Sequence, residues 1–141
     1  MATFKSSERI VNADRATIYN RLKNPESFKS LADNVPAEMK KQVESIRIDG
    51  NIITLRANPV GDISFRIDKG VENERLHLVT EKSPFPLSID VVLTDGDTMG
   101  STKEHVEVGI DLNPILKSML SKPLQEAAEK FAELIAVIPY N

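Results

Sequence analysis

The sequence predicts an α+β protein in which a strongly curved antiparallel sheet of seven strands wraps around a long C-terminal helix. Apolar and polar residues alternate with a period of two through residues 41–112, which is typical of strands with one buried face. Residues 114–138 return to helical spacing with a wide apolar stripe. An antiparallel sheet with one polar face must cover its other face, and this helix is the only predicted element long enough to do so.

The N-terminal segment predicts a strand followed by two short helices. The strand is expected over residues 3–11, and residues 12–14 supply helix-capping side chains. Pro25 ends the first helix and begins a second one that carries Phe28 and Leu31, because proline is tolerated in a first turn but not in mid-helix. The first helix has an apolar face formed by Ile18, Tyr19 and Leu22.

Six further strands follow, with turn signals at Asp49-Gly50-Asn51 and Asp95-Gly96-Asp97. Alternation within each strand predicts which side chains point inward. The expected inward positions are Ile46, Ile48, Ile53, Leu55, Ala57, Ile63, Phe65, Ile67, Leu76, Leu78, Thr80, Leu87, Ile89, Val91, Leu93, Val106, Val108, Ile110 and Leu112. One face of the sheet is therefore predicted to be apolar and the other polar.

Length and composition restrict the classes of function. A chain of 141 residues without repeats or a linker predicts one domain, residues 1–141. A formal charge of -3 provides no broad cationic surface for nucleic acid. With no cysteine and only two histidines, we expect no metal and no cofactor. No apolar run approaches the ~18 residues of a membrane span, and the N-terminus lacks the apolar core of a signal peptide, so we expect a cytoplasmic location.

Two short motifs carry a resemblance to a known family. Val11-Asn12-Ala13-Asp14 precedes the first helix, and Asn24-Pro25-Glu26 is followed by Phe28. With the order of elements, they make nearly the whole chain resemble the START-related helix-grip superfamily, also called SRPBCC or polyketide-cyclase-like. The resemblance implies a helix-grip fold with an internal apolar cavity between sheet and long helix, which the superfamily uses for lipids, sterols, quinones, polyketides and plant hormones. It implies no catalytic residue common to the family.

One end of the predicted sheet carries stiff, apolar loops. Successive connections in an up-and-down sheet alternate between its two ends, so every second loop lies at the same end of the sheet. Preorganised apolar loops suit the mouth of a cavity for an apolar ligand, although prolines also stiffen loops in proteins that bind nothing. The expected rim consists of Val35, Pro36, Pro59, Val60, Pro84, Phe85, Pro86, Pro114 and Ile115.

Glu104 is the candidate polar residue of the cavity. It shares strand parity with Val106, so a regular strand directs its carboxylate into the apolar face. Desolvation there would raise its pKa and suit it to general acid or base work, or to anchoring a ligand hydroxyl. Alternatively, a bulge near Gly100 or exposure at the strand's end returns Glu104 to water, as is usual for glutamate. His77 and His105 fall on the polar face, where solvated histidines are expected.

The sequence favours the binding of a hydrophobic small molecule, such as a lipid, a quinone or a polyketide-like compound, in the internal cavity. One alternative is a polyketide cyclase or dehydratase-like enzyme that uses the same cavity, with Glu104 moving a proton. Another is a protein-interaction module. The oligomeric state is left open. The expected ligand-binding residues are Phe28, Leu31, Leu55, Phe65, Leu78, Ile89, Glu104, Leu116, Met119 and Leu120.

Overall fold

The computed structural model describes residues 2–24, 43–57, 61–68, 70–82, 87–110 and 114–137. Its elements are β1 (Ala2–Lys5), β2 (Arg9–Val11), α1 (Arg15–Leu22), β3 (Val43–Asp49), β4 (Ile52–Ala57), β5 (Gly61–Ile67), β6 (Arg75–Lys82), β7 (Leu87–Asp95), β8 (Thr102–Ile110) and α3 (Pro114–Val137). The α+β class, the antiparallel sheet and the C-terminal helix are thus confirmed. The second short helix, predicted around Phe28 and Leu31, lies outside the described residues.

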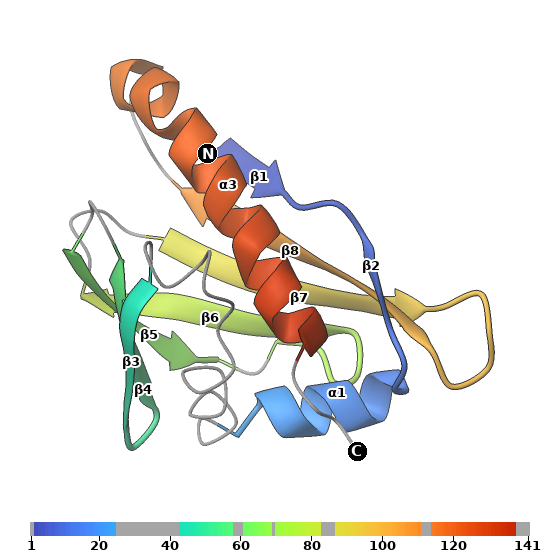
Figure 1. Ribbon diagram of the computed structural model, residues 1–141. Coiled ribbons are helices and arrows are strands. Elements are labelled where there is room, and N and C mark those ends of the chain that lie inside the picture. Colours follow the sequence, from blue (N-terminus) through green and yellow to red (C-terminus); the bar gives the residue numbers. More distant parts are fainter. Residues whose placement is uncertain are drawn as a thin grey trace.

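All strands belong to one antiparallel sheet. Its order is β1-β8-β7-β6-β5-β4-β3, and β2 also pairs with β8. The long strands therefore follow each other as a meander, while the N-terminal strands close the far edge. Figure 1 shows β3 and β4 turned sharply away from the direction of β6, β7 and β8, and α3 crossing the face of the sheet above the last two strands.

The face of the sheet that α3 crosses, here called the inner face, is mostly apolar. In β7 and β8 every second side chain is buried, as the period of two predicts. One cross-strand row joins five strands through directly opposed residues, which places their side chains on the same face. This row consists of Ile67, Leu78, Ile89, Val108 and Phe4. All five belong to the core or pack against it.

The N-terminal strand differs from the prediction, because it is interrupted. Lys5 opposes Glu107 and Arg9 opposes Glu104, so four steps along the N-terminal strand match three along β8. One extra residue in residues 6–8 therefore forms a bulge, which reverses the two faces of the strand beyond it. As a result, Ile10 is 57% exposed, while Arg9 and Glu104 have their side chains on the inner face.

Capping and a buried hydroxyl hold α1 against the sheet. The carboxylate of Asp14 accepts a hydrogen bond of 2.7 Å from the backbone N–H of Thr17. Hydrogen bonds with the side chain and then the backbone of Thr17 lower the pKa of Asp14. The hydroxyl of the fully buried Thr102 donates to the carbonyl of Ala13 at 2.7 Å. The predicted apolar face of α1 is buried, and the helix contacts β6 and β7.

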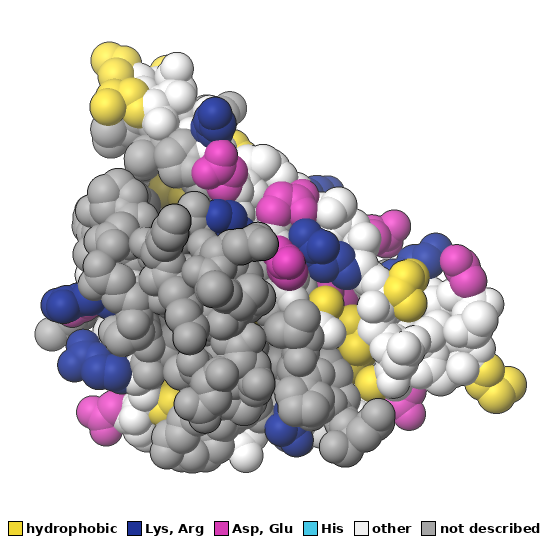
Figure 2. Space-filling view, viewed as in Figure 1, with side chains coloured by type: hydrophobic (Ala, Val, Ile, Leu, Met, Phe, Trp, Pro, Cys, Tyr) yellow, Lys and Arg dark blue, Asp and Glu magenta, His cyan; other side chains and the backbone are white. Residues whose placement is uncertain are grey.

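Helix α3 packs mainly on β8, β1 and β2. Its buried side chains include the small Ala128 and Ala132, which allow the helix to approach the sheet closely. Its outer face carries interspersed acidic and basic side chains (Figure 2). No helix among the described residues has the length and apolar character needed to cross a membrane.

We expect Ala132→Leu to destabilise the protein. Ala132 is completely buried in α3, so three additional heavy atoms force shifts that typically cost about 1–3 kcal/mol. Denaturant unfolding measures the change. Glu133→Leu is the matched control, because the neighbouring position is exposed and should change the free energy of unfolding by less than about 0.5 kcal/mol. Equal effects of the two substitutions would contradict close packing of α3 on the sheet.

Candidate functional site

Three apolar residues among the predicted ligand-binding residues lie on the inner face. Phe65, Leu78 and Ile89 come from β5, β6 and β7 and are 3%, 1% and 7% exposed. They are buried although α3 packs mainly on the strands at the other edge of the sheet, β8, β1 and β2. The inner face thus has two parts, one under α3 and one formed by β4 to β7.

Several predicted residues remain predictions. Phe28 and Leu31 lie outside the described residues, and the structure describes the backbone but not the side chains of Leu55, Leu116 and Leu120. Most of the predicted rim also falls outside: Val35, Pro36, Pro59, Val60, Pro84, Phe85 and Pro86. Of the rim, the structure describes only the start of α3, where Pro114 and Ile115 are exposed, Ile115 by 74%.

Met119 does not face the interior, so its prediction as a cavity residue is wrong. It is 68% exposed. The reason is helical geometry: Met119 precedes the buried Leu124 by five residues and therefore lies about 140° around the helix from it. The apolar stripe of the sequence was wider than the face that α3 buries. Apolar side chains consequently gather at the N-terminal tip of α3 (Figure 2), which projects beyond the sheet (Figure 1).

Glu104 is fully buried on the inner face. It has 0% exposure, and it lies beside Leu93 of β7 in the register of the sheet. Neither carboxyl oxygen has a hydrogen-bond partner among the described residues. Of the two alternatives that the sequence allows, the inward orientation is therefore the one that the structure shows. A buried carboxyl group without a partner is rare in folded proteins, and it points to a role other than stability.

Burial makes Glu104 a weaker acid than an exposed glutamate, because it raises the pKa of the carboxyl group. Desolvation raises the pKa of its carboxyl group from 4.5 to about 8, and the nearby positive charge of Arg9 offsets only part of this shift. At neutral pH the group is therefore mainly protonated. A neutral carboxylic acid both donates and accepts hydrogen bonds, and a pKa close to neutrality also permits proton transfer.

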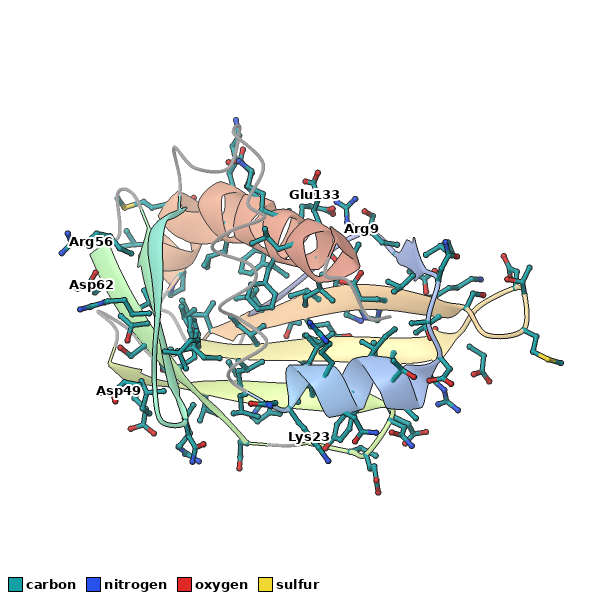
Figure 3. All side chains as sticks on the ribbon, turned by 60° about the horizontal axis from the view of Figure 1, so that its bottom comes forward. Arg9, Lys23, Asp49, Arg56, Asp62 and Glu133 are labelled. Atoms are coloured by element: carbon teal, nitrogen blue, oxygen red, sulfur yellow. The ribbon has the colours of Figure 1, made fainter. Side chains whose placement is uncertain are left out.

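Arg9 is a site residue that the sequence did not indicate. Its Nη2 donates to the Oε2 of Glu129 and to the carbonyl of the same residue, both at 3.3 Å, and so ties β2 to α3. Ser7 adds to this link, because its backbone N–H and hydroxyl donate to Glu129 at 2.7 and 2.9 Å. Figure 3 shows Arg9 beside α3, on the same side as Glu133. A regular strand would have turned Arg9 outward, and only the bulge brings it to the inner face.

The outer face of the sheet carries a network of charged and polar side chains. His77 lies 2.6 Å from Asp90, and His105 lies 2.8 Å from Glu107. Arg75 reaches both carboxylates, at 3.4 and 3.6 Å. Burial alone would raise the pKa of Glu107, but its hydrogen bond to His105 and the positive charge of Arg75 lower it overall. The histidines thus lie on the predicted face, but they are paired rather than simply solvated, and the described residues contain no cluster that could hold a metal.

A concavity lies away from the residues that were predicted to line the ligand cavity. It has a volume of about 500 Å³, opens to solvent at the β3–β4 hairpin and is lined by Arg47, Ile48, Asp49 and Thr54. Figure 3 shows Asp49 near this hairpin. Because its lining is largely polar and includes none of the predicted ligand-binding residues, it does not correspond to an apolar cavity under α3.

No protein-family model and no curated protein sequence matches the chain. Solved structures do match over nearly its whole length. A START superfamily protein from Mycobacterium smegmatis is 12% identical with a TM-score of 0.60, and the match covers 94% of this chain and 96% of that one. This protein has the START-like helix-grip fold.

Two further solved structures match over most of their length. A protein from Thermus thermophilus is 18% identical, with a TM-score of 0.63 and coverage of 96% of this chain and 94% of that one. Norcoclaurine synthase from Thalictrum flavum, in complex with dopamine and hydroxybenzaldehyde, is 15% identical, with a TM-score of 0.66 and coverage of 96% and 85%. At these identities the similarity shows the shared START-like fold alone.

The stability of the protein should fall as pH rises through neutrality because of Glu104. Its pKa is about 8 in the folded state, whereas the unperturbed value expected in the unfolded chain is 4.5. Between these two pH values the folded state retains a proton that the unfolded chain loses. The free energy of unfolding then decreases by up to about 1.4 kcal/mol per pH unit. Urea unfolding between pH 5 and pH 8 measures this slope. Glu104→Gln should flatten it, and an identical slope in that variant would contradict a raised pKa.

Replacement of Glu104 by an apolar residue should stabilise the protein. Glu104→Met fills a similar volume and removes a buried carboxyl group that has no hydrogen-bond partner among the described residues, whose desolvation costs about 1–3 kcal/mol. Thermal and denaturant unfolding at pH 7 report the gain. Glu107→Gln, on the opposite face of β8, is the control and should not stabilise. A loss of stability in Glu104→Met would indicate a hidden partner of the carboxyl group.

Proposed function

We propose that the protein binds a hydrophobic small molecule, of the lipid, quinone or polyketide type, in an internal cavity between the sheet and α3. The observation that carries the proposal is Glu104, whose carboxyl group is fully buried in an apolar face and has no partner among the described residues. A protein gains nothing in stability from such a group. A ligand with a matching polar atom would satisfy it.

The division of the inner face supports a space for a ligand. Helix α3 packs mainly on β8, β1 and β2, whereas α1 contacts β6 and β7. The apolar side chains of Phe65, Leu78 and Ile89 lie on β5, β6 and β7, outside the main contact of α3, and they would supply the desolvation energy that drives binding of an apolar compound. The same fold holds two aromatic compounds in norcoclaurine synthase, namely dopamine and hydroxybenzaldehyde.

A catalytic function is the second candidate, and the acidity of Glu104 favours it. A carboxyl group with a pKa of about 8 exchanges its proton readily near neutral pH, as a cyclase or dehydratase-like reaction requires. Glu104→Gln separates the two functions. Loss of turnover with retained binding would identify an enzyme, whereas a binding protein shows no turnover in either form.

The direct test is a thermal-shift screen of lipids, quinones and aromatic polyketides, combined with native mass spectrometry of the purified protein. A compound that binds only the folded state stabilises it, by about 2.7 kcal/mol at one hundred times its Kd. We expect at least one class to raise the Tm. The absence of any shift and of any co-purified compound would contradict the proposal.

Binding should depend on the inner face of β7. We expect Ile89→Ala to weaken the best compound of the screen roughly tenfold, because it removes apolar contact area worth about 1–2 kcal/mol. Titration calorimetry well below the Tm measures the affinity. Val92→Ala is the matched control, since Val92 opposes His105 on the outer face of the same strand. Equal losses in both variants would place the ligand elsewhere.

A further inference from the structure

Two polar side chains of opposite character share one place on the inner face. Arg9 of β2 and Glu104 of β8 are direct cross-strand partners, so their side chains leave the sheet on the same side. The Nε of Arg9 and both carboxyl oxygens of Glu104 are buried without a hydrogen-bond partner among the described residues. Unsatisfied buried polar atoms are few in folded proteins, and two such residues side by side require a common explanation.

These two residues do not satisfy each other, because Arg9 is held elsewhere. The Nη2 of Arg9 bonds to the carboxylate and the carbonyl of Glu129 on α3. This anchor fixes the outer end of the guanidinium group and leaves the Nε–H unused in the interior. A donor on one side and a carboxyl group on the other therefore remain available to a third group.

The balance of charge indicates what that third group is. Arg9 is positive and pairs with the negative Glu129 at 3.3 Å, while burial raises the pKa of Glu104 to about 8 and keeps it mainly neutral. The three groups together are close to neutral. A ligand anion would add an uncompensated buried charge, which is costly, whereas a neutral hydroxyl group adds none. A hydroxyl also has the required chemistry, since it accepts and donates hydrogen bonds at once.

We propose that Arg9 and Glu104 form a two-point subsite for the hydroxyl group of an otherwise apolar ligand. The hydroxyl oxygen accepts a hydrogen bond from the Nε–H of Arg9, and its O–H donates to the carboxyl group of Glu104. The substrate class is thus a neutral alcohol or phenol, rather than a carboxylate or a pure hydrocarbon. This subsite rests on the proposed function, because it requires a ligand on the inner face.

The test compares compounds that differ only in the polar group: naphthol, naphthalene and naphthoate, and decanol, decane and decanoate. Affinities are measured at neutral pH by ligand fluorescence for the aromatic series and by displacement of bound naphthol for the alkyl series. In the native protein we expect each hydroxyl compound to bind about tenfold tighter than its hydrocarbon, and the carboxylate to bind more weakly than the hydroxyl compound.

Matched variants test whether the preference for the hydroxyl compounds depends on the polar atoms of Arg9 and Glu104. Glu104→Met and Arg9→Met each place an apolar atom near the position of the lost polar one, and each should reduce the tenfold preference to about threefold or less. Glu129→Gln weakens the anchor of Arg9 but retains both atoms of the subsite, so the preference should persist. Glu107→Gln on the outer face should leave it unchanged. Glu104→Met is expected to fold well, so its result stands even where Arg9→Met is too unstable to measure.

The outcomes separate the subsite from the proposed function. Equal affinity for the hydroxyl compounds and their hydrocarbons would mean that water serves these polar atoms, which overturns the subsite and leaves the proposed function standing. Tightest binding of the carboxylates, or a preference that survives in Glu104→Met, would also overturn it. Binding of no compound in either series would overturn the proposed function and the subsite together.

Discussion

The interior of this protein depends on how its N-terminal strand pairs with β8. The pairing begins as a regular ladder in β1, gains one residue in the segment 6–8 and continues in β2 with its faces exchanged. Ser6 holds the irregular point, because its backbone N–H donates to the carbonyl of Val106 and its hydroxyl accepts from the N–H of Val106, both at 2.8 Å. Through this one irregularity a cationic side chain reaches the face that α3 covers, directly opposite a buried carboxyl group.

The inward-facing residues of much of the sheet can be predicted from the sequence, because side chains alternate between the two faces along a regular strand. The period of two predicted that Leu76, Val91 and Val106 point inward, and each is fully buried. The same rule directs Glu104 inward if β8 is regular, although exposure at the end of the strand was the usual alternative for a glutamate. Its complete burial could not be predicted, since that depends on β2 and on the packing of α3, which are tertiary features.

The failures of sequence interpretation have equally physical causes. A bulge belongs to a pair of strands, so the letters Ser6-Ser7-Glu8 alone do not reveal it, and the inward position of Arg9 was missed. Met119 was assigned to the interior because an apolar stripe on a helix is wider than the surface that one sheet buries. Both errors have the same cause: the direction of the side chain depends on a neighbouring strand or sheet that the local sequence does not specify.

The two faces of the sheet stabilise their ionisable side chains in different ways. On the outer face, Arg75 joins two carboxylates that each have a histidine partner, so these charged groups share one network. On the inner face, Glu104 lowers the cost of its burial by retaining its proton. The first solution uses partly exposed ion pairs, which salt screens, whereas the second keeps a polar atom available at the expense of stability.

The bulge also makes the interior tolerant of a change in chain length. Four steps along the N-terminal strand match three along β8, so the loss of one residue within residues 6–8 would restore a regular ladder and leave Arg9 opposite Glu104. The orientation of Arg9 is set by the register of β2 against β8, and the connector can reach that register with or without its extra residue. A deletion of one residue in this short connector can therefore pass through evolution without altering which side chains the interior presents.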